Sequence, residues 1–227
     1  MSTLEAVGLT KAYGALVALE PLDLAIDGGE LVVLVGHNGS GKSTFLSMVA
    51  GLLEPSDGSV LVAGAPAGSI PARAATSFLP DNPVLFDDLS LMEHLEYIAR
   101  LNGVDDWEDR AGELIDRLGL TERADDLPAH FSRGLRQKTA IALGFVRPFE
   151  LLLVDEPFVG LDPQGRDALV VLLDEAHRGG AAVVVATHQL DFVRRADRCV
   201  ALRDGAVVFD GPPGGADVDA LVMGDDQ

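Results

Sequence analysis

The fold class of this chain is decided by the stretch Gly36-His37-Asn38-Gly39-Ser40-Gly41-Lys42-Ser43-Thr44. The stretch matches G-x-x-x-x-G-K-[ST], a glycine-rich loop whose backbone N–H groups surround phosphate oxygens. The apolar run 31–35 before it is typical of a strand buried on both faces, and the apolar run 45–50 after it is compatible with a helix. An ordinary Gly/Ser loop is the alternative, and these flanks argue against it. The sequence therefore predicts a site for a nucleoside triphosphate.

Two side chains of this loop carry the expected chemistry. Lys42 is long enough to reach the terminal phosphates, and the hydroxyl of Ser43 can ligate Mg²⁺. The N-terminus of the following helix adds favourable partial charge for an anion. A nucleoside triphosphate and Mg²⁺ are the ligands that follow, and the family resemblance described below implies that the nucleotide is ATP.

Composition limits the other classes of protein. The chain has 227 residues, 48% of them hydrophobic and 23% charged, which indicates a globular protein of one large domain or a core with a small insert. Its net charge of −19 argues against the nucleic-acid backbone or an anionic membrane as a surface-bound partner. No apolar run reaches the roughly 18–20 residues that span a bilayer, and residues 1–5 lack the features of a signal peptide. With the single cysteine, Cys199, these observations predict a cytoplasmic protein.

Alternating strand and helix patterns indicate an α/β fold with a mainly parallel sheet. The segment from about 87 to 148 is different and mostly helical. In it, Ser90 and Glu93 form a predicted capping box, and Gly119 is the predicted C-cap of a second helix that begins near Trp107. Beyond this segment we expect strands and helices in alternation: a strand at 151–154, a helix at 163–177, a strand at 181–186, a short helix at 189–196, and a pair of strands at 199–202 and 206–209.

A second cluster of polar residues follows the apolar run 151–154, namely Asp155 and Glu156. Functional groups gather at the carboxyl ends of strands in a parallel sheet, where the phosphate loop also lies. Asp155 fits a carboxylate that holds Mg²⁺, and Glu156 fits a residue that orients or deprotonates the attacking water. A pair of acids at a solvated strand end is the alternative.

Together these motifs resemble those of the ATP-binding cassette (ABC) ATPases, over about residues 4–211. Residues 131–135, Phe-Ser-Arg-Gly-Leu, lie where that family has its Leu-Ser-Gly-Gly-Gln signature, and 159–162 resemble its D-loop. Thr187-His188 resembles the switch histidine, and Tyr13 the aromatic residue that stacks on adenine. The resemblance implies one ABC ATP-binding domain over 1–227: a P-loop NTPase (RecA-like) core with an N-terminal antiparallel β subdomain and an inserted α-helical subdomain.

The resemblance also implies roles for single residues. The implied catalytic residues are Lys42, Glu156 and His188, and the implied metal ligands are Ser43, Asp81 and Asp155. The implied nucleotide-binding residues are Tyr13, Gly36, His37, Asn38, Gly39, Ser40, Gly41, Lys42, Ser43, Thr44, Ser132, Arg133 and Gly134.

Several of these residues have a purely structural alternative. Ser132 and Asp162 are plausible helix N-caps, the latter followed by a proline. His188 alone would more often be a structural histidine, and Tyr13 a packing residue. The capping and ligand-binding roles of Ser132 are compatible, because a helix N-terminus is an anion site.

Two departures from the family pattern stand out. Arg133 and Leu135 replace the glycine and glutamine of the commonest signature, and Asp81 replaces the Q-loop glutamine. The signature version here resembles that of bacterial cassettes that pair with separate export-type membrane subunits. An acid at position 81 adds negative charge beside the triphosphate, so we expect altered metal dependence.

The resemblance implies the ATP-hydrolysing subunit of a membrane transporter of the export type. It also implies that one subunit does not suffice, since a single cassette has an incomplete site. A second ATP-binding subunit, most simply a copy of the chain, completes it head to tail. A separate integral-membrane permease would dock in the groove between the Asp81 loop and the helical insert, near Val84, Leu85 and Phe86. A place in the core is the alternative for these three residues. This places the protein on the inner face of the cell membrane. A soluble cassette ATPase that acts on ribosomes or DNA is the alternative function.

Overall fold

The computed structural model describes residues 2–215, which form two compact units. The first unit comprises residues 2–78, 149–156 and 176–215, and the second comprises 79–148 and 157–175. The predicted helical segment lies in the second unit, together with residues 157–175, which follow the acidic pair.

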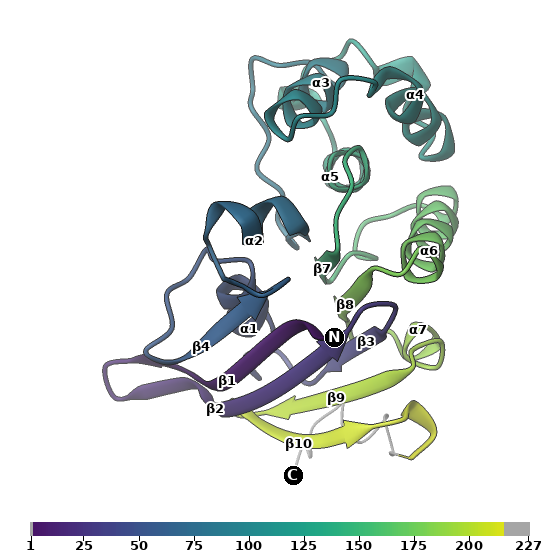
Figure 1. Cartoon of the computed structure of the whole chain (residues 1–227). Coiled ribbons are helices and arrows are strands. Elements are labelled where there is room, and N and C mark those ends of the chain that lie inside the picture. The colour runs from purple at the N-terminus through teal and green to yellow at the C-terminus, as the bar shows by residue number, and fades with distance from the viewer. Residues whose placement is uncertain (1, 216–227) are drawn as a thin grey trace. The chain divides into compact units, whose positions relative to one another are not determined.

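Two β-sheets make up the framework of the first unit (Figure 1). An antiparallel sheet has the order β2 (Leu16–Asp27), β1 (Ser2–Tyr13), β4 (Asp57–Val62) and β5 (Ala65–Pro66). A second sheet has the order β10 (Ala206–Gly211), β9 (Arg198–Arg203), β3 (Leu31–Val35), β8 (Ala182–Ala186), β7 (Leu151–Asp155) and β6 (Thr76–Leu79). Strands β9, β3, β8 and β7 run parallel, and β10 pairs antiparallel with β9. The α/β class and the N-terminal antiparallel sheet are therefore confirmed.

Helix α1 (Lys42–Val49) packs against β2, β4 and β7, so it contacts strands of both sheets. Its apolar side chains belong to one continuous core together with the inward faces of β1, β2, β3 and β8. Phe45 and Leu46 are fully buried there. Because α1 begins where the phosphate loop ends, this core fixes the position of the loop. Two short helices complete the unit, α2 (Ile70–Ala75) and α7 (Leu190–Val193), with a 3₁₀ turn at Pro213–Gly215.

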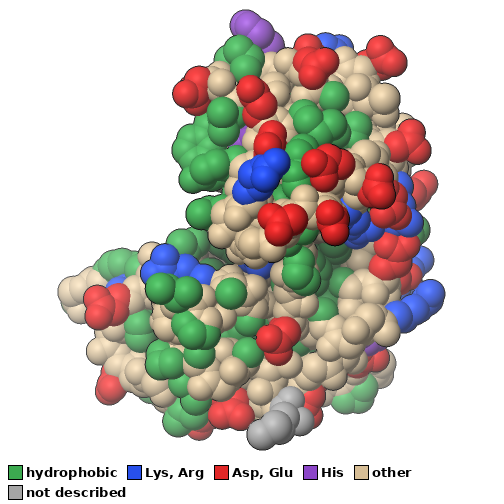
Figure 2. All heavy atoms as spheres, turned by 45° about the horizontal axis from the view of Figure 1, so that its top comes forward, with side chains coloured by type: hydrophobic (Ala, Val, Ile, Leu, Met, Phe, Trp, Pro, Cys, Tyr) green, Lys and Arg blue, Asp and Glu red, His purple; other side chains and the backbone are tan. Residues whose placement is uncertain are grey.

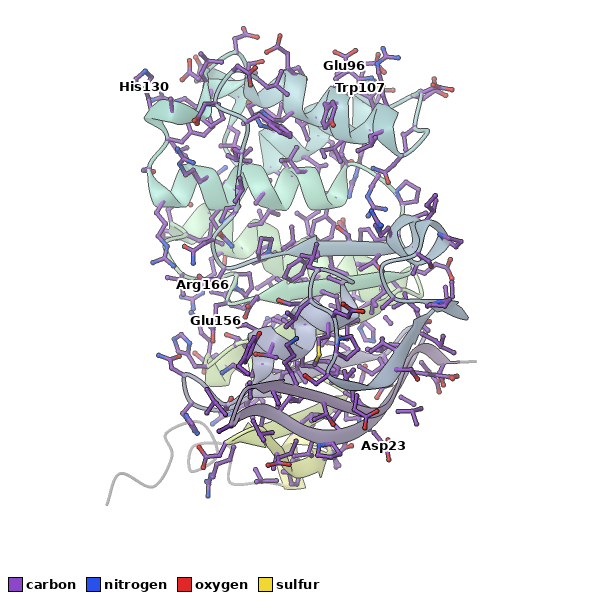
Figure 3. The ribbon with its side chains drawn as sticks, turned by 90° about the vertical axis from the view of Figure 1, so that its left-hand side faces the viewer. Asp23, Glu96, Trp107, His130, Glu156 and Arg166 are labelled. Atoms are coloured by element: carbon purple, nitrogen blue, oxygen red, sulfur yellow. The ribbon has the colours of Figure 1, made fainter. Side chains whose placement is uncertain are left out.

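The second unit consists of helices. Helices α3 (Leu91–Leu101), α4 (Glu108–Arg117) and α5 (Arg133–Phe145) contact one another, and residues 163–175 of α6 (Pro163–Arg178) belong to the same unit. Short 3₁₀ turns lie at Thr121–Arg123 and Pro128–His130. Figure 3 labels Glu96 on α3 and Trp107, which directly precedes α4.

The local signals of the sequence hold well in these helices. Ser90 and Glu93 form the predicted capping box, with Glu93 Oε2 accepting the Ser90 N–H at 2.7 Å. Gly119 has a φ of +65° directly after the last turn of α4, as expected of a C-cap glycine. Helix α2 was not expected, although Ser69 caps it and Pro71 lies in its first turn. Within residues 2–215, no helix combines the length and the apolar character that crossing a membrane requires.

A close approach of two glycines generates a test of this fold. Gly51 has a φ of +70°, and a Cβ on it would lie 2.2 Å from the Cα of Gly68. Gly64 has nearly the same φ, +75°, but a Cβ there would meet nothing within 4 Å. Gly64→Ala should therefore lower the free energy of unfolding only by the strain of an alanine at positive φ, about 1–3 kcal/mol. Gly51→Ala should lower it by at least about 2 kcal/mol more, because the backbone of 67–68 must move. Urea unfolding of both variants measures the difference, and equal losses would contradict the close packing.

Candidate nucleotide-binding site

The phosphate loop connects the buried strand β3 to helix α1 in the first unit. Three of its glycines have positive φ values, +146° at Gly36, +84° at Gly39 and +105° at Gly41. Other residues rarely adopt these angles, so the loop needs glycine for its backbone conformation. This curled backbone is the nest that the sequence predicts.

Neighbouring backbone also requires glycines in the loop. A Cβ on Gly36 would lie 2.2 Å from the carbonyl oxygen of Leu202, and one on Gly41 would lie 2.9 Å from that of Ala18. The turn between β9 and β10 supports the loop directly, since the Gly205 N–H donates to the carbonyl of Ser40 at 3.1 Å. The loop is thus held by backbone contacts from β2 and from the β9–β10 turn.

Lys42 is the first residue of α1 and is buried, with 6% of its surface exposed. Its Nζ donates to the carbonyl of Gly36 at 2.7 Å and to that of His37 at 3.1 Å. Burial lowers the pKa of the Lys42 ammonium, whereas the carboxylates of Glu156 and Asp155 favour its charged form. Lys42 therefore lies within the electrostatic reach of both predicted acids.

The remaining loop residues fit a triphosphate. The hydroxyl of Ser40 is buried and has no hydrogen-bond partner within the described chain, and Ser43 is an exposed residue in the first turn of α1. His37 contributes its carbonyl to Lys42, while its ring lies 3.5 Å from the Asp204 carboxylate. An unused hydroxyl, a backbone nest and a buried cation form a cradle for anionic oxygens.

The predicted acids lie at the carboxyl end of β7. Figure 3 labels Glu156. Asp155 is the last residue of the strand and is buried, with 6% exposure. Glu156 follows with a φ of +44°, a conformation that residues with a side chain seldom adopt and that is typical of functional sites. Its N–H donates to the carbonyl of Ala186 at 2.8 Å, which holds this backbone next to β8.

His188 lies close to Glu156, as the predicted roles of both require. The Nδ1 of His188 is 2.9 Å from Glu156 Oε2, so the imidazole can donate a hydrogen bond to the carboxylate. The preceding residue, Thr187, is buried, and its N–H bonds to the carbonyl of Leu34 on β3 at 3.1 Å. The His188 side chain is 56% exposed. This pair orients the carboxylate and leaves the histidine accessible to a ligand.

Tyr13 ends β1 and is 53% exposed. The Nζ of Lys11 lies 5.1 Å from the centre of its ring, within cation–π distance. The adenine-stacking role of Tyr13 stays a prediction.

The signature segment lies in the second unit. Ser132 caps α5, with its hydroxyl accepting the Leu135 N–H at 3.3 Å, so its predicted capping role is confirmed. Gly134 packs tightly, because a Cβ on it would lie 2.5 Å from the carbonyl oxygen of Gly160. The signature segment and the D-loop-like segment are therefore in direct backbone contact.

Asp162 is also a helix cap, accepting the Gly165 N–H at 2.8 Å. Its second oxygen accepts from the buried ammonium of Lys138 at 2.9 Å, and this bond lowers the pKa of Asp162. The sequence motifs predict no role for Lys138. Its position among apolar residues on the buried face of α5 is the feature that could have indicated a paired, buried charge.

Asp81 belongs to the second unit, as do Ser132, Arg133 and Gly134, whereas all other predicted site residues belong to the first. Asp81 Oδ1 lies 3.0 Å from a guanidinium nitrogen of Arg133, and Oδ2 accepts from the Asn82 amide at 2.8 Å. The metal role of Asp81 stays a prediction. No three His, Cys, Asp or Glu side chains gather as a metal site within residues 2–215. A cation held by Ser43, Asp155 and phosphate oxygens needs no such group.

Comparison with known proteins gives the same family. The family model described as "ABC transporter" matches residues 19–159. The chain is 36% identical to the ABC-type transporter ATP-binding protein EcsA of Bacillus subtilis (strain 168), over 91% of this chain and 86% of that protein. It is 34% identical to the SkfA peptide export ATP-binding protein SkfE of the same organism, over 92% of this chain and 89% of that protein.

Solved structures agree with the fold. The ATP-binding subunit of an ABC transporter superposes with a TM-score of 0.90 at 35% identity, over 97% of this chain and 98% of that one. An ATP-binding cassette in a dimeric post-hydrolysis state with ADP and Pi gives a TM-score of 0.82 at 27% identity, over 92% and 98%. With a phosphate loop, a buried lysine and a strained glutamate in place, the chain belongs to the ABC transporter family, as an ATP-binding and ATP-hydrolysing subunit.

Proposed function

We propose that this chain drives an exporter whose membrane-spanning subunits are separate chains, and that it works with Mg²⁺ as a head-to-tail pair of copies. The observation that carries the catalytic part is the cluster of Lys42, Asp155, Glu156 and His188 around the phosphate loop. The export part is supported by the printed name of SkfE, a peptide export protein that matches along most of its length. The net charge of −19 disfavours the alternative of an ATPase acting on ribosomes or DNA.

Lys42 and the loop backbone would hold the nucleotide. In the structure, the Lys42 ammonium is satisfied by the carbonyls of Gly36 and His37. Phosphate oxygens are charged acceptors, so charge-assisted bonds to them are stronger than those to neutral carbonyls. Negative charge on the ligand also opposes the effect of burial on the Lys42 pKa. Binding should therefore draw the ammonium toward the terminal phosphates.

Glu156 and His188 would act on the water that attacks the phosphate. A carboxylate within hydrogen-bond reach of that water can orient it and accept its proton. The bond from His188 Nδ1 fixes the carboxylate, and the strained backbone of Glu156 keeps it at the end of β7. Mg²⁺, held by Ser43 and Asp155, would supply positive charge to the phosphate oxygens.

The second subunit would supply the signature segment. Ser132, Arg133 and Gly134 begin α5, and a helix N-terminus favours an anion such as a phosphate. A self-complementary pair with two-fold symmetry needs only one sequence. The dimeric ADP-bound cassette among the similar structures supports this arrangement.

A surface patch on the second unit is the proposed contact with the permease. It consists of Val84, Phe86 and Tyr97, whose exposures are 95%, 53% and 45%. Leu85 is only 8% exposed and is therefore a core residue, whereas its neighbours Val84 and Phe86 lie on the surface. Figure 2 shows hydrophobic side chains gathered at the left edge of the helical unit. Isolated exposed apolar residues are common, but a contiguous group marks an interaction surface.

His94 holds this patch in shape. It is 2% exposed, and its Nε2 accepts the Phe86 N–H at 2.9 Å while Nδ1 bonds to the Ser90 carbonyl at 2.8 Å. The Phe86 ring stacks on His94 and meets Tyr97 edge to face. A patch held by these contacts offers a partner a preformed apolar surface, which lowers the entropic cost of binding. Docking there would place the protein peripherally on the inner face of the cell membrane.

Lys42→Ala should weaken nucleotide binding by roughly 10- to 150-fold, because one or more charge-assisted hydrogen bonds of about 1.5–3 kcal/mol are lost. Titration with a fluorescent ATP analogue measures the affinity. The control is Arg123→Ala, which removes an exposed cation of the second unit that pairs with Asp126. Wild-type affinity in Lys42→Ala would show that the loop does not bind phosphate.

Glu156→Gln should bind ATP normally, hydrolyse it about 10²- to 10⁴-fold more slowly, and accumulate as an ATP-bound dimer. Phosphate release and size-exclusion chromatography with ATP and Mg²⁺ measure these effects. Glu150→Gln is the matched control, since it makes the same chemical change at an exposed residue just before the opposite end of β7. An active Glu156→Gln variant would transfer the role to Asp81 or His188.

Val84→Asp should leave the melting temperature and ATP binding unchanged but release the protein from membranes that contain its permease. Val84 is almost fully exposed, so a carboxylate there stays hydrated. Val171→Asp, at an exposed apolar residue of α6 outside the patch, is the control. Membrane fractionation of both variants gives the readout. Sedimentation of the wild-type protein with ribosomes, and never with membranes, would favour the alternative function.

A further inference from the structure

Arg133 occupies an electrostatically unfavourable position. It is the first residue of α5, where the helix dipole presents partial positive charge, and the first turn of this helix contains no acidic residue. Arg136, in the same turn, adds a second cation. An anion from elsewhere in the chain would offset the unfavourable charge of a guanidinium at this place.

That anion is Asp81, which is 52 positions away in the sequence. Its Oδ1 lies 3.0 Å from a guanidinium nitrogen of Arg133, and its other oxygen is occupied by the amide of Asn82. The aliphatic stem of Arg133 lies beside the D-loop-like segment, since a Cβ added to Gly160 would be 3.6 and 3.7 Å from its Cγ and Cδ. The arginine thus runs past Gly160 and pairs through its guanidinium with Asp81, all within the second unit.

We propose that Asp81 is a positioning residue for Arg133, so that two of the three residues that depart from the common family pattern form one matched pair. The negative charge at position 81 and the positive charge at position 133 offset each other, and each lowers the electrostatic cost of placing the other. Asp81 then acts through Arg133 and not as a ligand of Mg²⁺. The inference rests on the proposed function in one respect, since the oriented guanidinium would face the nucleotide held by the second subunit.

A double-mutant cycle tests this coupling. The variants are Asp81→Asn, Arg133→Gln and their combination, each in the Glu156→Gln background, and the readout is the ATP concentration for half-maximal dimer by size-exclusion chromatography. Asp81→Asn should raise this concentration about two- to fivefold, the range of an exposed ion pair. In the Arg133→Gln background, the same change should have no further effect.

Asp126→Asn is the matched control, because Asp126 forms an exposed pair with Arg123 in the same unit at 2.9 Å. It should not change the dimerisation midpoint. An equal effect of Asp81→Asn in both backgrounds, or no effect in either, would overturn the proposal.

A second measurement separates this proposal from the dimer itself. A single subunit binds a fluorescent ATP analogue, and the Mg²⁺ concentration for half-maximal binding should be the same in Asp81→Asn as in the wild type. A raised Mg²⁺ requirement would overturn the proposal and assign Asp81 to the metal. If the Glu156→Gln protein stays monomeric with ATP, the proposed pair of copies is wrong, but the Asp81–Arg133 proposal can still be tested. Urea unfolding of the same variants without nucleotide should show coupling between positions 81 and 133 in the free energy of unfolding. Additive effects of the two substitutions would overturn the proposal.

Discussion

The rest of the site depends on the hydrogen bonds and charge interactions of the buried Lys42 ammonium. A lysine with 6% exposure is stable in its charged form only with acceptors close by, and the structure supplies two backbone carbonyls and the field of two carboxylates. Those carbonyls point at the ammonium because the loop curls through glycines with positive φ. Two of these glycines are also needed for space, because backbone of β9 lies close to Gly36 and backbone of β2 lies close to Gly41.

These contacts of Lys42 and of the loop glycines explain the order of elements along the sequence. Helix α1 starts at Lys42 and buries Phe45 and Leu46 in the core shared with both sheets, so the loop cannot move without disturbing that core. The acids follow β7, which pairs with β8, and β8 pairs with β3. The parallel pairing brings the ends of the three strands to one edge, where the loop, Glu156 and His188 lie.

Much of this was predictable because it depends on local signals. The phosphate loop, the capping box at Ser90 and the C-cap at Gly119 are set by a few neighbouring residues, and the structure has each where the sequence indicates it. Helix α2 was missed because it is six residues long and shows little apolar periodicity. The buried state of Leu85 between exposed Val84 and Phe86 was not predictable, since three consecutive apolar residues carry no period. The ion pairs of Arg133 and Lys138 join residues far apart in the sequence, so only the folded chain shows them.

The positive φ of Glu156 has a consequence for how such a chain can evolve. At this position glycine would relieve the backbone strain, and strain of this kind amounts to about 1–3 kcal/mol. Selection for stability alone would therefore favour glycine here, and under the proposed role of Glu156 a more stable but inactive protein lies one substitution away. The strain at this position thus supports the proposal that activity, and not folding, determines the residue there.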